Sequence, residues 1–156
     1  MKTIIIYATK HGAAGEIAQR IADKMDGTAV HNLKKGSAPS LEDFDCVIIG
    51  TSLYAGMIRG EVKAFLSQNA GALQGKKLGL FLSGLDAGEE KINFDRNFPP
   101  EILKNAKAAG FFGGIFDPKK AGLVERLVMK VVAKKSAYEN TIDDSRIEQF
   151  VKTMKA

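Results

Sequence analysis

Short apolar runs alternate with helical periodicity along most of the chain. Five runs share the length and apolar character of sheet strands, the second being the weakest: residues 3–7, 28–33, 46–49, 78–82 and 111–116. Apolar side chains recur at helical spacing in residues 16–25 and 62–66, and Pro99-Pro100-Glu101 predicts the first turn of a further helix. This alternation predicts a mostly parallel sheet with helices on both faces.

The C-terminal region ends in a clear amphipathic helix. Its apolar stripe consists of Ile147, Phe150, Val151 and Met154. Thr141 and Asp144 have the spacing of a capping box, with Asp in the usual Glu position, and we expect them to start this helix.

The loops that follow the strands are the candidate ligand sites, because crossovers in a parallel sheet bring these loops to one edge. The first loop, residues 8–15, is rich in small residues and runs directly into a helix. Backbone N–H groups and a helix N-terminus can converge there on an anion, with Thr9 as a hydroxyl donor and Lys10 and His11 as sources of charge. A tight strand-to-helix turn without a ligand would have the same composition.

Three common phosphate chemistries do not fit the first loop. A nucleotide P-loop would need Gly-Lys-Ser/Thr after it, and a Rossmann fingerprint would need two further glycines. A phosphoryl-accepting receiver would need acidic residues at the ends of the first and third strands, where the chain has Ala8-Thr9 and Gly50-Thr51.

The second and third loops favour a flat ligand. Residues 50–57 place Tyr54 among hydroxyl and small residues, and a tyrosine in such a loop can stack on a planar ring. Residues 83–88 are again small. Three such loops on one edge suit a planar ring system with a phosphate tail, although Tyr54 could also be an ordinary loop anchor.

The first strand and loop resemble the flavodoxin signature, in which an apolar strand ends in an aromatic residue and is followed by Ser/Thr, Gly and an Ala-containing helix. The matching positions are Tyr7, Thr9, Gly12, Ala18 and Ile21. Ala14 departs from the signature, because the family usually has a Thr whose hydroxyl helps to hold the FMN phosphate. Losing such a bond to a charged group costs roughly 1.5–3 kcal/mol.

The resemblance implies a flavodoxin-like α/β three-layer sandwich with a five-stranded parallel sheet in the order 2-1-3-4-5, and FMN as cofactor. It covers the whole chain as one domain, residues 1–156, with an insert at about 117–140. The FMN-binding residues that it implies are Thr9, Lys10, His11, Gly12, Ala13, Ala14, Thr51, Ser52, Leu53, Tyr54, Ala55, Gly56, Ser83, Gly84, Leu85, Asp86 and Ala87.

The chain is most similar to one branch, the menaquinone-dependent protoporphyrinogen oxidase group. It shares the similar start, the Ile-Gly-x-Ser-type second loop and a distinctive C-terminal region. That region begins at Gly113-Gly114-Ile115-Phe116-Asp117-Pro118 and continues through a basic, apolar segment. This similarity is weaker evidence for the substrate than the three loops are for a flavin cofactor.

The charge of the chain is concentrated in that segment. The net charge is +5, but residues 117–135 hold six basic and two acidic residues, a local +4, so the rest carries +1. About 25 residues separate the last strand from the last helix there, against roughly 2–6 in most α/β connections. The basic residues, which are candidates for membrane or partner docking, are Lys119, Lys120, Arg126, Lys130, Lys134 and Lys135.

The segment predicts an amphipathic helix, for which three interpretations remain open. Its apolar positions are Leu123, Val124, Leu127, Val128, Val131 and Val132, and Glu125, Arg126 and Lys130 lie on the other face. It could dock on the domain with its basic face in solvent, lie on an anionic membrane, or contact an acidic protein. Nucleic acid is not expected, because no aromatic residues are interleaved.

The hypothesis for function is an FMN-dependent oxidoreductase, an enzyme that passes electrons from a substrate such as protoporphyrinogen to a quinone. The alternative is a soluble flavodoxin-type electron carrier, although such carriers tend to be acidic; a scaffold without FMN is a third. With 45% hydrophobic and 26% charged residues and no signal-peptide pattern, the expected location is cytoplasmic, with peripheral contact at the inner face of the membrane. The single cysteine, Cys46, is expected in the core, with no metal site.

Overall fold

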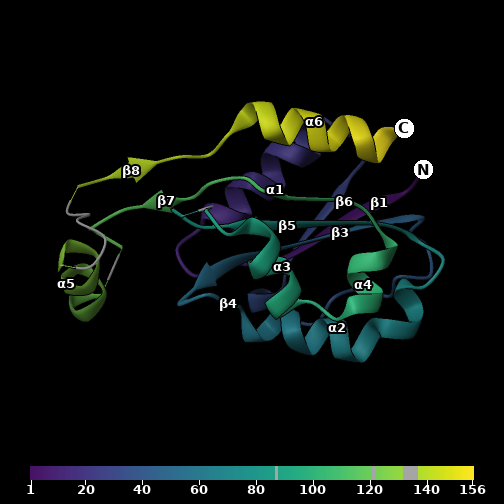
Figure 1. Cartoon of the computed structure of the whole chain (residues 1–156). Helices are drawn as coiled ribbons and strands as arrows, with labels where there is room; N and C mark the ends of the chain where they lie inside the picture. Colours follow the sequence, from purple (N-terminus) through teal and green to yellow (C-terminus); the bar gives the residue numbers. More distant parts are fainter. Residues whose placement is uncertain (87, 121, 132–136) are drawn as a thin grey trace.

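A central parallel sheet organises the computed structural model, which describes residues 1–86, 88–120, 122–131 and 137–156. Its strands lie in the order β2-β1-β3-β5-β6, and β4 pairs antiparallel with β3 (Figure 1). The predicted flavodoxin-like order 2-1-3-4-5 is therefore confirmed. The strands are β1 (Thr3–Ala8), β2 (Ala29–Asn32), β3 (Cys46–Tyr54), β4 (Met57–Ile58), β5 (Lys77–Ser83) and β6 (Ala106–Phe111).

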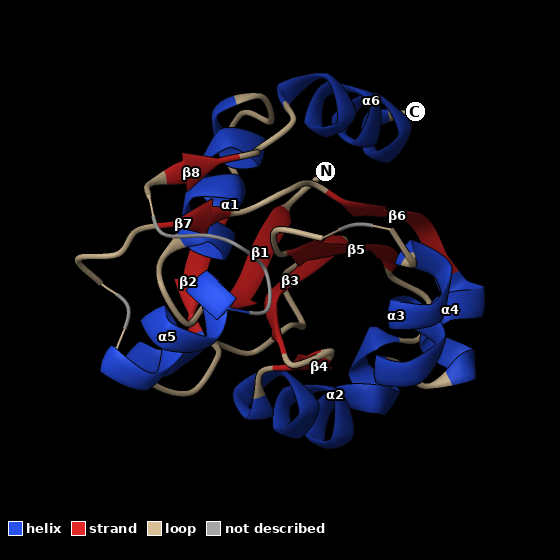
Figure 2. Ribbon diagram, turned by 60° about the vertical axis from the view of Figure 1, so that its left-hand side comes forward, coloured by secondary structure: helices blue, strands red, loops and turns tan. Residues whose placement is uncertain are grey.

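Helices cover both faces of the sheet. On one face lie α1 (Ala13–Asp23) and α6 (Asp144–Lys155), and on the other lie α2 (Gly60–Leu73), α3 (Glu90–Asn97) and α4 (Pro100–Asn105) (Figures 1 and 2). Pro100 occupies the first turn of α4, as predicted. A short 3-10 helix, η1 (Leu33–Lys35), follows β2. The three-layer architecture follows from strands that are apolar on both faces.

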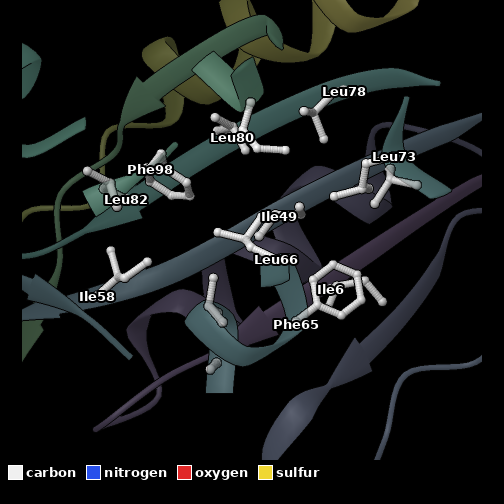
Figure 3. Packing of buried hydrophobic residues seen from close by; sticks show 14 of the residues in the cluster. Ile6, Ile49, Ile58, Phe65, Leu66, Leu73, Leu78, Leu80, Leu82 and Phe98 are labelled. Carbon is white, nitrogen blue, oxygen red and sulfur yellow. The ribbon is translucent and has the colours of Figure 1, made fainter. Parts of the chain in front are cut away.

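The core consists of two apolar clusters, one on each face of the sheet. Because side chains alternate along a strand, Ile4 and Ile6 of β1 belong to the cluster under α2 and α4, whereas Ile5 belongs to the cluster under α1 and α6. Figure 3 shows the first cluster, with Phe65 and Leu66 of α2 packed toward the strands. Cys46 is fully buried in the second cluster, as expected, and burial raises the pKa of its thiol.

The predicted fifth strand is wrong in its placement. The strand β6 is Ala106–Phe111, not residues 111–116. Its residues before Phe111 are small or charged, so they lack the apolar run on which the prediction relied. The run itself is interrupted because Gly113 adopts a left-handed backbone with φ 86°, which ends strand pairing.

Two helix starts also differ from the sequence prediction. The helix α1 begins at Ala13 rather than at residue 16, directly after Gly12. The N-cap of α6 is Asp143, whose carboxylate accepts a hydrogen bond from the Arg146 amide at 3.1 Å, so the predicted capping box is wrong. The Thr141 hydroxyl instead accepts a hydrogen bond from the Gly114 amide at 3.1 Å.

The segment between β6 and α6 leaves the body of the fold. It forms β7 (Ile115–Phe116) and β8 (Glu139–Asn140), which pair antiparallel, and between them the helix α5 (Leu123–Val131). In Figure 1 this unit stands at the left of the sheet, beyond the carboxyl ends of β3 and β5. The segment between β6 and α6 thus carries its own small hairpin and helix at the edge where the candidate loops meet.

Candidate functional site

The three candidate loops and α5 enclose one cavity of about 310 Å³. This volume lies at the lower end of the roughly 300–1,000 Å³ of small-molecule sites. The cavity lies at the carboxyl ends of β1, β3 and β5, where ligands bind in open parallel sheets. Its walls are Thr9, Lys10, His11, Ala13, Ser52, Leu53, Tyr54, Ala55, Ser83, Gly84, Leu85, Gly114, Ile115, Phe116, Glu125 and Met129.

The first loop turns into α1 through a left-handed residue. Gly12 has φ 98°, and its amide donates to the Thr9 hydroxyl oxygen at 2.9 Å. The Lys10 amide donates to the Ser52 hydroxyl oxygen at 3.1 Å, which joins the first loop to the second. The first-turn amides of α1 have no carbonyl one turn earlier to bond, so this end of the cavity can bind an anion.

Both basic side chains of the first loop lie close to an acid of α5. The Nε2 atom of His11 is 2.9 Å from each carboxylate oxygen of Glu125, and Lys10 Nζ is 3.9 Å from one of them. The Glu125 side chain is only 17% exposed. This cluster joins residues 114 positions apart in the sequence and ties α5 to the loop that precedes α1.

The second loop is a two-residue hairpin that presents Tyr54. Ala55 and Gly56 have φ values of 50° and 75°, the two consecutive left-handed residues that a type I′ turn requires. Tyr54 remains 47% exposed, and Lys10 Nζ lies 3.1 Å from its ring centroid. The Lys10 ammonium therefore covers one face of the Tyr54 ring in a cation–π contact.

The buried side chain of Asn97 holds this hairpin from below. Its carbonyl oxygen accepts a hydrogen bond from the Ile58 amide at 3.1 Å. Its amide nitrogen donates to the Gly56 carbonyl at 3.0 Å and to the Asn93 carbonyl at 2.8 Å. The C-terminal half of the turn that presents Tyr54 is therefore tied to α3.

The third loop is held against the segment that follows β6. The Gly84 amide donates to the Gly113 carbonyl at 3.0 Å. A Cβ atom on Gly114 would lie 2.8 Å from the carbonyl carbon and oxygen of Gly84, so only glycine fits at this crossing. The close approach brings Ile115 and Phe116 into the wall of the cavity.

The helix α5 faces the cavity with one charged and one apolar side chain. Glu125 and Met129, one turn apart, line the cavity. The apolar residues on its other side are between 62% and 78% exposed: Leu123, Val124, Leu127 and Val131. These four apolar side chains are not buried against the body, which α5 contacts through Glu125 and Met129, while Arg126 and Lys130 are exposed.

Eleven of the predicted FMN-binding residues line the cavity, and the structure places the others as follows. Thr51 and Ala14 are fully buried, and the Thr51 hydroxyl accepts a hydrogen bond from the Arg59 amide at 3.1 Å. Gly12 and Gly56 shape the two turns, and Asp86 is exposed with its carboxylate bonded to the Gly88 amide. Ala87 lies outside the described residues, as do Lys134 and Lys135.

Five cavity residues were not predicted. They are Gly114, Ile115, Phe116, Glu125 and Met129. The Gly-Gly pair that precedes an apolar-aromatic dipeptide was a visible signal for the first three, because close backbone crossings need glycine. Among the predicted docking residues, Lys119, Lys120, Arg126 and Lys130 are exposed.

The comparison with known families agrees with this geometry. The sequence matches the family Flavodoxin_5, described as a flavodoxin domain, over residues 4–143. The chain belongs to this family. Protoporphyrinogen IX dehydrogenase [quinone] of Escherichia coli K12 is 23% identical over 150 residues, which cover 89% of this chain and 82% of that protein.

Solved structures show the same fold. Rubredoxin oxygen:oxidoreductase of Desulfovibrio gigas superposes with a TM-score of 0.62 at 17% identity, over 99% of this chain but only 34% of that protein. A flavoprotein of Lactobacillus acidophilus, solved in complex with FMN, superposes with a TM-score of 0.51 at 13% identity, over 72% of this chain and 91% of that one. The chain thus spans about a third of the first protein and most of the second.

The family assignment supports FMN as the cofactor, and the cavity has matching features at both ends. The first loop offers a helix N-terminus with two basic side chains for a phosphate, and Tyr54 offers an aromatic face for a planar ring. Ala14, fully buried, contributes a methyl group where the family signature has a hydroxyl. Within the described ranges, no cluster of His, Cys, Asp and Glu could hold a metal ion.

Proposed function

We propose that the protein is an FMN-dependent oxidoreductase that delivers electrons to a quinone at an anionic membrane surface. The observation that carries the proposal is the position of α5. One side of this helix lines the flavin cavity, and the other exposes Leu123, Val124, Leu127 and Val131 beside basic residues. An apolar stripe flanked by Lys and Arg is the pattern of a helix that lies in a membrane interface.

The residues of the chain have separable tasks in this proposal. The first loop holds the phosphate, Tyr54 orients the ring system, and Leu85, Ile115 and Phe116 exclude water from the cavity. When bound, FMN would supply two-electron redox chemistry, by which the reduced substrate loses two electrons and two protons and the quinone gains two of each to become a quinol. The similarity to a protoporphyrinogen dehydrogenase makes protoporphyrinogen the first substrate to assay.

The contact with lipid would be peripheral, at the inner face of the membrane. Of the helices within the described ranges, none has the length and apolar character to cross a bilayer. The exposed cations Lys119, Lys120, Arg126 and Lys130 would each contribute about 1 kcal/mol of attraction to an anionic surface. The net charge of +5 also favours this surface over the basic partners of acidic electron carriers.

The proposal is tested by the reoxidation of the reduced, FMN-loaded protein with a menaquinone analogue in lipid vesicles. We expect fast reoxidation with phosphatidylglycerol vesicles and slow reoxidation with phosphatidylcholine vesicles. Leu127→Glu should abolish vesicle binding and slow the reaction, whereas Ile92→Glu, at an exposed apolar position on α3, should change neither. Equal rates with both lipids and with both variants would refute membrane delivery.

A soluble electron carrier is the second candidate, because the loops alone suit a carrier equally well. Carriers exchange single electrons with protein partners and have no small substrate of their own. Rapid exchange with a ferredoxin-type reductase, together with no turnover of protoporphyrinogen or quinone, would favour the carrier.

A further inference from the structure

The Glu125 carboxylate contacts the same basic side chains that a cofactor phosphate would contact. It lies 2.9 Å from His11 Nε2 through both oxygens and 3.9 Å from Lys10 Nζ. Both of these residues belong to the loop whose helix-start amides form the anion end of the cavity. A carboxylate in this position satisfies the same cations that would otherwise face a phosphate.

The same contact fixes the orientation of α5. The apolar residues Leu123, Val124, Leu127 and Val131 are largely exposed, whereas the opposite side of the helix is tied to the body through Glu125. Two negative groups, a carboxylate and a phosphate, repel each other when they share one small cationic cluster. Phosphate and Glu125 therefore compete for this cluster of His11 and Lys10.

We propose that Glu125 is an internal competitor for the cofactor phosphate, so that FMN loading displaces it from His11 and Lys10 and frees α5, whose apolar side is already exposed, to adapt to the docking surface. The docking part rests on the membrane contact proposed above; the competition part rests only on the Glu125 cluster. By linkage, if FMN raises the affinity of the protein for the docking surface by some factor, the docking surface raises the affinity for FMN by the same factor. Cofactor loading and docking would then be coupled through one side chain.

The competition is tested by equilibrium titration of FMN and riboflavin into the wild-type protein and Glu125→Gln. Riboflavin has the same ring system but no phosphate, so it does not compete with Glu125. We expect Glu125→Gln to bind FMN about tenfold more tightly, within the range of typical coupling factors, and riboflavin unchanged. The control Glu101→Gln removes the same charge from an exposed site on α4 and should change neither affinity.

Three results would overturn the competition. These are unchanged or weaker FMN binding by Glu125→Gln, an equal gain for FMN and riboflavin, or an equal gain in Glu101→Gln. Weaker FMN binding would mean that Glu125 supports the phosphate site, for example by orienting the imidazole of His11. Circular dichroism of each variant separates these results from a loss of folding.

The coupling is tested by binding to phosphatidylglycerol vesicles with and without FMN. We expect FMN to strengthen binding of the wild-type protein and to have no effect on Glu125→Gln, which should bind as the loaded wild type does. If neither protein binds vesicles in any state, the membrane proposal fails, while the titration above still decides the competition. If both bind equally with and without FMN, docking stands and the coupling is refuted.

Discussion

Asn97 links the stability of the fold to the geometry of the cavity, and its removal should affect both. The side chain is buried and makes three hydrogen bonds, of which two hold the turn that carries Tyr54. The change Asn97→Ala leaves the Ile58 amide and the Gly56 carbonyl without these partners. At a net 0.5–1.5 kcal/mol per bond, we expect a loss of about 2–4 kcal/mol in the free energy of unfolding.

The same change should weaken FMN binding. Once the C-terminal half of the turn is released, binding must order its residues again, at about 1–2 kcal/mol for each backbone residue fixed. Ordering even one residue corresponds to about a tenfold rise in the FMN dissociation constant. Urea denaturation measures the free energy of unfolding, and quenching of FMN fluorescence measures the FMN dissociation constant.

Asn69→Ala is the matched control for Asn97→Ala. Its amide donates to the Phe65 carbonyl at 2.9 Å within α2, away from the cavity, so the control loses one hydrogen bond and leaves FMN affinity unchanged. The reasoning is refuted if Asn97→Ala is no less stable than Asn69→Ala. It is also refuted if the two variants bind FMN equally well.

Three further predictions concern other tight or buried positions. A Cβ on Gly50 would lie 1.9 Å from the Phe81 ring, so Gly50→Ala should lower the free energy of unfolding by about 1–3 kcal/mol or more. Gly71 has open space on α2, so Gly71→Ala should raise the free energy of unfolding by about 0.5–1 kcal/mol. Urea denaturation measures both changes. Gly114→Ala should push the third loop outward and weaken FMN and riboflavin binding alike, unlike Glu125→Gln; unchanged affinities in titrations would contradict the close crossing. Because burial raises the pKa of the Cys46 thiol, this residue should resist a thiol reagent at pH 8 until urea unfolds the chain, and rapid labelling of the native protein would contradict this burial.

The central strands could be predicted from the sequence because they are buried on both faces. The runs that became β1, β3 and β5 have few polar residues, and such runs occur where helices cover a parallel sheet. The strand β6 has no such run, since an edge position with small residues such as Ala108 and Gly110 gives neither an apolar run nor a clean alternation. The helix α3 was missed for a similar reason, because its buried residues are few and its Ile92 is exposed.

The loops of the site could be predicted from topology, but α5 could not be placed. Parallel strands bring their carboxyl ends together, so the loops after β1, β3 and β5 had to meet. The amphipathic pattern of α5 predicted a helix and did not reveal which side faces the body. The contact between His11 and Glu125 depends on the path of the chain after Gly113 and Gly114, which is set by tertiary contacts with Thr141.

The claim that the cavity holds FMN is tested most directly by one titration. FMN is added to the purified wild-type protein and to Tyr54→Ala while the flavin fluorescence is recorded. We expect quenching that saturates at one FMN per chain at micromolar concentration, with weaker binding by Tyr54→Ala. Absence of quenching and of any flavin spectral change at micromolar FMN would show that the cavity does not hold FMN, and would rule out both redox functions.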